Sequence, residues 1–246
     1  MILSMSVFRA ATNTTVGTIE RRLLISYQAD PDVIRSVVPA PLRLRLVEDR
    51  AVVGICLLRL GQLRPGVLPR WTGLRSENVA HRIGVEHPTP DGWRPGVYIP
   101  VRHSTSWVNV AAGGRCWPGV HHRAHIHSIE QAQHLDVRVE GPDVRIRASG
   151  HSAPRLTSRL FETLEEASRY YEIGTVGWSP DHHDRLEAMR LEVHAWEVEP
   201  FELDAVRSSY FDDTSRFPAG TVTLDSALLM RNLAVSCRRV PANGRS

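Results

Sequence analysis

Hydrophobic and polar residues alternate with a period of two along much of this chain, which is the pattern of strands with one buried face. The alternation is strict in LRLRLV at 42–47, and strand-like runs also occupy 16–27 and 78–86. The run AVVGICLLRL at 51–60 is apolar almost throughout, which is typical of a strand buried on both faces. The first third of the chain is therefore predicted to be mostly strand.

The same pattern continues towards the C-terminus and predicts one β-rich domain. Further strands are predicted at 96–101, 122–130, 134–140, 143–150, 189–199 and 229–240. No internal repeat, low-complexity segment or linker divides the chain. We therefore expect a β-rich α+β fold, a closed or nearly closed antiparallel β-barrel or cone, over 16–241. A flexible tail is expected at 1–15 and a short one at 242–246.

Three short helices are predicted between these strands. Asp30 and Pro31 mark the start of the first, as its N-cap and first helical residue. Ser104 is the expected N-cap of the second. Thr163 and Glu166 form a capping box at the start of the third, TLEEASRYY. A few short helices within a strand-rich chain agree with the expected fold.

Composition and charge exclude several classes of function. Hydrophobic residues make up 42% of the 246 residues and charged residues 23%, as in ordinary globular proteins. The net charge is only +3 and no block of like charges occurs, so nucleic acid is not an expected partner. No apolar window approaches the roughly 18 residues of a membrane span, and the N-terminus does not resemble a signal peptide. We expect a cytoplasmic protein without a membrane partner.

Two residue counts bear on the chemistry. The three cysteines, Cys56, Cys116 and Cys237, lie far apart without C-x-x-C spacing, which favours buried free thiols over disulfides or a zinc site. The chain contains 30 arginines and no lysine. A mechanism that needs the amine of a lysine side chain is therefore excluded.

Several segments together resemble one known family. They are RRLLISYQADPDVIRSVVPAPLRLRLV, SENVAHRIGV, GVYIPVRHSTSWVNVAAGGR, RCWPGVHHRA, and TLEEASRYY followed by LEVHAWEVEPFEL. In order and spacing they are similar to the acetoacetate decarboxylase-like superfamily. Over roughly 18–240 the chain resembles the large, uncharacterised bacterial branch of that superfamily rather than acetoacetate decarboxylase itself.

The resemblance implies a β-barrel or cone with a small buried pocket, in which the decarboxylase forms a Schiff base through a lysine. Aligned on Gly119, the position of that lysine is His122, and the adjacent second lysine is Arg123. Neither side chain can replace a primary amine, so Schiff-base decarboxylation is excluded. The pocket glutamate of the family corresponds to Glu77. The pocket arginine corresponds to Glu20, with Arg21 and Arg22 beside it.

Four histidines between His121 and His127 follow this turn. If 121–128 is one extended strand, alternation places His122, Ala124, Ile126 and Ser128 on one face and His121, Arg123, His125 and His127 on the other. The apolar neighbours predict that His122 points inward. Near Glu77 its imidazole could act as a general acid or base, because its ordinary pKa of roughly 6.5 is close to working pH. The alternative is a packed histidine whose ring bonds a backbone carbonyl.

The other histidine face suggests a metal site as a lesser alternative. His121, His125 and His127 share that face, and HIHSIE comes close to a cupin motif. Side chains at these spacings on a strand diverge too far to meet on one ion unless a bulge intervenes. A solvated polar face is the simpler interpretation, and no cofactor is expected.

These observations predict an enzyme that acts on a small carbonyl- or carboxylate-bearing metabolite, of lyase, dehydratase, isomerase or cyclase type. His122 and Glu77 are the expected catalytic pair. Substrate contacts are expected from Arg123, Arg22, Tyr98 and Trp117. The alternatives are a non-catalytic protein that binds a small molecule, and a metal protein that uses the second histidine face. The sequence leaves oligomerisation open.

Overall fold

The computed structural model describes residues 14–115 and 118–240, most of which lie in strands. In chain order the elements are β1 (Thr14–Ala29), α2 (Pro31–Arg35), β2 (Arg43–Leu44), β3 (Leu46–Val47), β4 (Arg50–Pro65), a 3₁₀ turn (Arg70–Thr72), β5 (Leu74–Thr89), β6 (Gly92–Ser104), α3 (Trp107–Ala112), β7 (His122–Arg123), β8 (His125–Gln131), β9 (His134–Glu140), β10 (Arg145–Ser152), α4 (Leu164–Glu172), β11 (Val176–Pro180), β12 (Leu186–Val193), β13 (Glu199–Ser208) and β14 (Val222–Val240). No helix among these residues is both long enough and apolar enough to cross a membrane.

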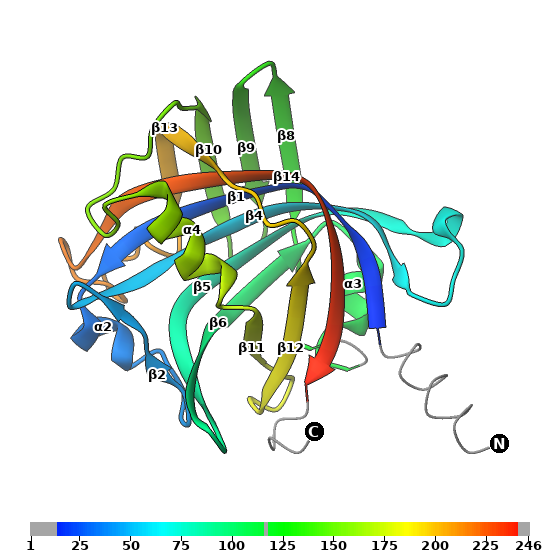
Figure 1. Ribbon diagram of the computed structural model, residues 1–246, viewed down its shortest axis with the longest axis horizontal. Coiled ribbons are helices and arrows are strands. Elements are labelled where there is room, and N and C mark those ends of the chain that lie inside the picture. The colour runs from blue at the N-terminus through cyan, green and yellow to red at the C-terminus, as the bar shows by residue number, and fades with distance from the viewer. Residues whose placement is uncertain (1–13, 116–117, 241–246) are drawn as a thin grey trace.

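Seven strands close into a ring. Neighbouring strands pair in the order β1, β4, β5, β6, β11, β12 and β14, and β14 pairs back onto β1 (Figure 1). All of these pairs are antiparallel except β6 with β11, which is parallel. The predicted fold class, β-rich with a few short helices and a closed arrangement of strands, is confirmed, and the parallel pair is an addition to it.

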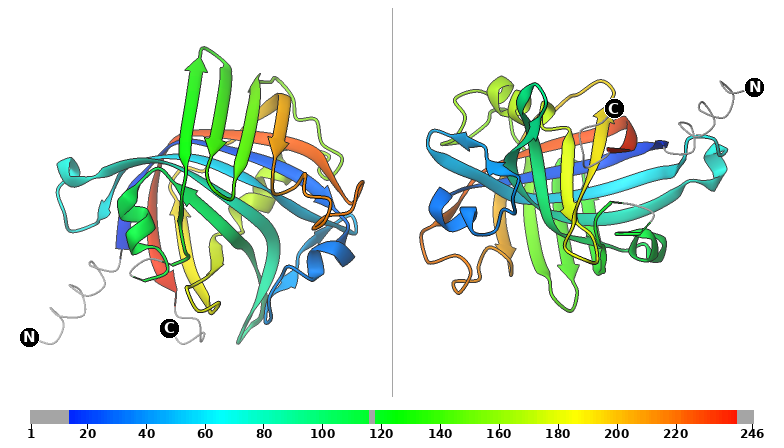
Figure 2. Two further views of the ribbon diagram at one scale, coloured as in Figure 1. Left: turned by 180° about the vertical axis from the view of Figure 1, so that it is seen from behind. Right: turned by 90° about the horizontal axis from the view of Figure 1, so that it is seen from below.

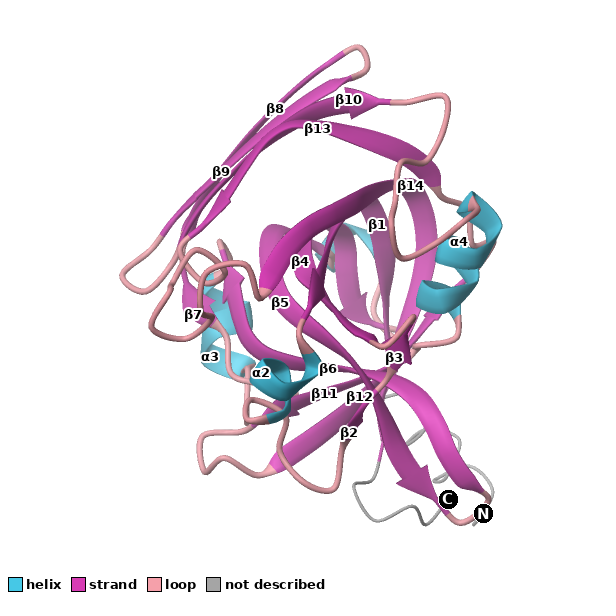
Figure 3. Cartoon of the chain, turned by 90° about the vertical axis from the view of Figure 1, so that its left-hand side faces the viewer, coloured by secondary structure: helices cyan, strands magenta, loops and turns pink. Residues whose placement is uncertain are grey.

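The long strand β14 joins this ring to a second sheet. β14 pairs with β1 along nearly its whole length, with β12 at its C-terminal end and with β13 near Leu229. From β13 the sheet continues through β10 and β9 to β8. Figures 2 and 3 show these strands as a separate layer that lies across β1 and β4.

The two sides of the ring wall each bury an apolar cluster. Residues of β1, β4 and β5 such as Leu23, Ile55 and Val79 pack outward against Val137 and Ile146 of the second sheet. Their neighbours along the same strands, including Ile19, Leu24 and Cys56, face the inside of the ring. Because both faces of β4 are covered, its sequence is continuously apolar rather than alternating.

Helix α4 packs against the inside of the ring through Ala167, Tyr170 and Tyr171. Its predicted cap is confirmed, since the Thr163 hydroxyl accepts a hydrogen bond from the backbone N–H of Glu166. The predicted cap of the second helix is shifted, because Ser106 rather than Ser104 caps α3. The Ser104 hydroxyl instead donates to Asn78.

Candidate functional site

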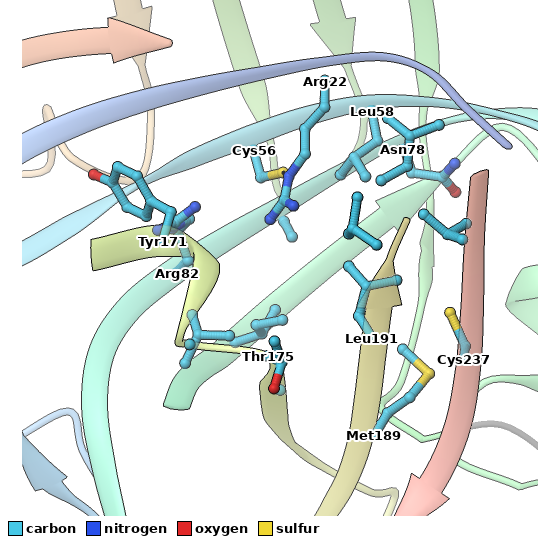
Figure 4. A pocket seen from close by; sticks show the side chains of 18 of the residues that line it. Arg22, Cys56, Leu58, Asn78, Arg82, Tyr171, Thr175, Met189, Leu191 and Cys237 are labelled. Atoms are coloured by element: carbon cyan, nitrogen blue, oxygen red, sulfur yellow. The ribbon is translucent and has the colours of Figure 1, made fainter. Parts of the chain in front are cut away.

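The ring encloses a cavity of about 400 Å³, within the usual range for small-molecule sites. Much of its wall is apolar, with Leu58, Ile99, Met189, Leu191 and Val235 as examples. Figure 4 shows Arg22, Arg82, Tyr171 and Cys237 among the side chains that line it.

Alternation along paired strands brings polar groups into this apolar wall. On β5, Asn78, Ala80, Arg82 and Gly84 all line the cavity, while the residues between them mostly belong to the outward-facing core. Arg22 on β1 lies opposite Leu58 on β4, and Leu58 lies opposite Asn78. The inward face of β5 is thus made of small or polar residues with one arginine near its middle.

Arg82 is half-buried, and its guanidinium lies 4.3 Å from the centre of the Tyr171 ring. The Tyr171 hydroxyl is 2.5 Å from that of Ser26, which fixes the ring. Burial lowers the pKa of Arg82. Arg22 lies beside it and donates from Nε to the sulfur of Cys56 at 3.2 Å.

Arg102 projects from β6 against a different part of the wall. Its Nε and Nη2 donate to the Ser179 hydroxyl at 3.1 and 2.8 Å. Burial lowers the pKa of Arg102 to about 10. The backbone at Gly119 passes so close that a Cβ there would lie 3.0 Å from Arg102 Nε, and Gly119 has a positive φ of 81°. Only glycine fits this turn without strain.

His121 follows this turn and lines the cavity. Its Nδ1–H donates to the Gly119 carbonyl at 3.0 Å, which leaves Nε2 as an acceptor. Burial and, second, the positive charge of Arg102 lower the pKa of His121 to about 3. His121 is therefore a neutral imidazole at physiological pH, held beside a buried cation.

His122, the histidine expected to point into the pocket, does not line the cavity. Its side chain is 49% exposed and lies 3.5 Å from Asp143. The expectation was wrong because 121–128 is not one strand: β7 pairs with β6, whereas β8 begins again at His125 and pairs with β9. The predicted alternation holds only from Ala124 onward, where Ala124 is buried and His125 is exposed.

Glu77 lies on the opposite face of β5 from the cavity and does not meet His122. Its carboxylate bonds Arg21 at 2.8 Å, Arg59 at 2.6 Å and the Ser128 hydroxyl at 3.1 Å. Glu130 extends the cluster towards both arginines at 3.7 and 3.9 Å. The expected catalytic pair is therefore divided between the surface and an ion-pair cluster outside the ring.

The remaining predicted contacts are also separated. Arg22 lines the cavity. Arg123 instead stacks on Trp107, 4.8 Å from the ring centre, and Tyr98 belongs to the outer core. Trp117 lies outside the described residues.

The alternative metal face is not assembled either. His121 lines the cavity, whereas His125 and His127 are exposed on β8. The described part of the chain contains no group of three histidine, cysteine or carboxylate side chains placed to hold a metal ion. The separation follows from the change of strand partner at Ala124.

Arg82 and Arg102 are cavity residues that the sequence reasoning missed, and His121 was considered only as a metal ligand. A signal existed for Arg82, because SENVAHRIGV places Asn78, Ala80, Arg82 and Gly84 on one face of a strand. For Arg102 no such signal exists, because a register shift between β5 and β6 breaks the alternation before it.

Comparison with solved structures shows the fold of known enzymes. Acetoacetate decarboxylase from Legionella pneumophila superposes with a TM-score of 0.60 at 11% identity, over 92% of this chain and 87% of that one. An acetoacetate decarboxylase-like enzyme from Sphingomonas wittichii gives 0.59 at 11% identity, over 92% of each chain. The enduracididine biosynthesis enzyme MppR with bound HEPES gives 0.58 at 14% identity, over 92% and 85%. These likenesses establish the fold.

A search of curated proteins found no match to this sequence. The family model DUF2071, described as an uncharacterized conserved protein, matches residues 17–220. That match covers most of the chain and agrees with the acetoacetate decarboxylase-like fold of the ring. The chain therefore belongs to the DUF2071 family.

Proposed function

We propose that this protein is an enzyme that moves a proton on a small carbonyl- or carboxylate-bearing metabolite inside the ring cavity. Enzymes of the same fold, among them acetoacetate decarboxylase and MppR, support a catalytic role. The chain contains no lysine, so a lysine Schiff base is not part of the mechanism.

The observation that carries this proposal is the placement of His121 beside Arg102 in the cavity wall. With Nδ1 bonded to the Gly119 carbonyl, Nε2 is the atom that accepts a proton from a carbon or hydroxyl next to the substrate carbonyl. The negative charge that forms on the carbonyl oxygen is then stabilised by the guanidinium of Arg102. His121 thus takes the role that the sequence assigned to His122.

The low pKa of His121 does not oppose this role, because part of the lowering comes from Arg102. An anion beside Arg102 offsets that positive charge and raises the pKa of the imidazole. The proton affinity of His121 therefore rises when the substrate oxygen becomes negative, as the reaction requires.

A second candidate is a protein that binds a small molecule without reaction. Its specific support is the same histidine, since an imidazole with a pKa of about 3 is a weak base. Both candidates place the ligand in the ring cavity and differ only in turnover.

The test is proton exchange in D₂O, followed by NMR on a panel of 2-oxo and 3-oxo acids that includes pyruvate and acetoacetate. We expect the protein to accelerate exchange of protons next to the carbonyl. His121→Gln should lower this rate by about 100- to 10,000-fold, the usual range for a general base. His122→Gln is the matched control and should leave the rate unchanged.

The outcomes separate the two candidates. Exchange that His121→Gln does not affect would contradict the role of His121. Panel members that bind in the cavity, as shown by chemical-shift changes, without any accelerated exchange would favour the binding protein.

A further inference from the structure

Besides Arg45, three arginines line the cavity, and none of these three has a carboxylate partner among the described residues. Arg22 bonds a thiol, Arg82 stacks on a tyrosine ring, and Arg102 bonds a serine hydroxyl. Over 14–115 and 118–240, no aspartate or glutamate lies within ion-pair distance of any of them. The three arginines are half-buried. Charges withdrawn from water are normally paired, so three uncompensated cations around one cavity indicate that the counter-ion comes from a ligand.

Other charged groups around the cavity do not neutralise these arginines. Glu192 bonds Arg238 and Ser236, and Glu172 is exposed at the end of α4. Arg45 also borders the cavity, but it donates to the Tyr170 carbonyl at 3.0 Å and stacks on the Tyr170 ring. The positive charge of the interior is therefore available to a bound molecule.

The three arginines form two groups. Arg22 and Arg82 lie together near Cys56 and Tyr171 (Figure 4). Arg102 lies near Gly177 and Met189, since a Cβ at Gly177 would be 3.8 Å from Arg102 Nη2 and 3.8 Å from the Met189 carbonyl oxygen. Figure 4 places Cys237 on the opposite side of the pocket from Tyr171 and Arg82, with Leu191 and Met189 nearby. Two cationic regions are thus separated by an apolar wall.

We propose that the ligand of this cavity carries two anionic groups joined by an apolar spacer, with Arg22 and Arg82 holding one group and Arg102 the other. This inference rests on the proposed function, because it names the substrate class for the same site. The planar fork of a guanidinium matches a carboxylate with two parallel hydrogen bonds. Arg102 gives two of its five N–H donors to Ser179, and the edge formed by its two Nη atoms keeps the parallel pair of donors that a carboxylate needs. The class is therefore dicarboxylic acids.

In this arrangement the two ends of the ligand have different tasks. Arg22 and Arg82 bind a carboxylate that does not react. Arg102 binds the oxygen atoms beside the reacting carbon, within the region of His121. A 2-oxo dicarboxylic acid of moderate length has both features.

The test is isothermal titration calorimetry of the full chain with adipate and with hexanoate, which share six carbons and differ by one carboxylate. Adipate should bind at least 10-fold more tightly, because a hydrogen-bonded charge pair contributes about 10-fold or more to affinity. Arg82→Gln and Arg102→Gln should each reduce adipate affinity to near that of hexanoate. Arg207→Gln, on the exposed face of β13, is the matched control and should change nothing.

The wild-type comparison does not depend on a variant that could fail to fold. Equal affinities for adipate and hexanoate, both abolished by Leu58→Trp within the cavity, would overturn the inference and leave the proposed function intact. Failure of both probes to bind would also overturn it, and the proton-exchange assay would then decide the proposed function separately. Tighter binding of adipate that neither arginine variant affects would place the second carboxylate elsewhere and refute the assignment.

Discussion

Glu77→Gln is expected to destabilise the fold without changing the ligand site. Glu77 accepts hydrogen bonds from Arg21 and Arg59 on the outer side of the ring, and the Arg21 side chain is 1% exposed. A glutamine offers one acceptor oxygen and turns an NH₂ group towards the other guanidinium. One buried arginine then loses its principal acceptor.

The magnitude follows from the contacts that remain. Removing one partner of a buried ion pair costs about 3–5 kcal/mol. Glu130 lies 3.7 Å from Arg21 and compensates in part, so we expect the lower end, about 3 kcal/mol. For a chain of this size each kcal/mol lowers the melting temperature by about 2–4 °C, which gives roughly 6–12 °C.

Differential scanning calorimetry of Glu77→Gln and of Glu202→Gln measures this effect. The Glu202 side chain is 66% exposed, so its variant should stay within about 0.5 kcal/mol of the parent protein. Adipate affinity, measured well below both melting temperatures, should be equal in the two variants. A change of less than 2 °C, or a loss of adipate binding in a folded Glu77→Gln protein, would refute the structural role of Glu77.

Two further variants test the packing inside and outside the ring. A Cβ at Gly84 would lie 2.0 Å from the Tyr170 hydroxyl, so Gly84→Ala should cost about 1–3 kcal/mol and speed amide hydrogen exchange in α4. Gly174→Ala is the control: its Cβ would meet nothing closer than 3.7 Å, so both the stability and the amide exchange of α4 should stay unchanged. Burial lowers the pKa of His81 to about 3, so the unfolded chain takes up its proton first and stability falls as pH drops from about 6.5 towards 3. His81→Phe should therefore flatten the pH dependence of urea unfolding in this window by up to about 1.4 kcal/mol per pH unit; an unchanged slope would contradict the burial of a neutral imidazole.

Most of the strands follow from local pattern, because each strand needs only alternation or an apolar run to bury its faces. The run at 51–60 illustrates this, since its continuous apolar sequence already indicates burial on both sides. The pattern missed β11 and β13, and the strand expected at 189–199 is β12, which spans Leu186–Val193. Which strand pairs with which does not follow from local pattern. Nothing in HHRAHIH shows that the chain leaves β6 after Arg123 and joins β9 from His125. The direction of His122 depends on that change.

The misplacement of Glu77 has a related cause. A glutamate at the start of a strand can face either side, and the resemblance to a family pocket favoured the inside. The two arginines and the serine that hold it outside come from β1, β4 and β8, which are far apart in the sequence. The position of Arg82 does not depend on distant partners, because alternation within a single strand places it on the same face as Asn78 and Gly84.

The pairing of β1 with β14 also determines when the cavity can form during synthesis. Thr14 lies opposite Arg238 and Ala29 opposite Val222, so the first described strand must wait for the last one. Until β14 (Val222–Val240) has left the ribosome, one edge of β1 and one edge of β12 lack a partner strand. Contacts of such long sequence separation slow folding, and the nascent ring exposes apolar strand edges meanwhile. Chaperone dependence and slow refolding are therefore expected consequences of how the ring is closed.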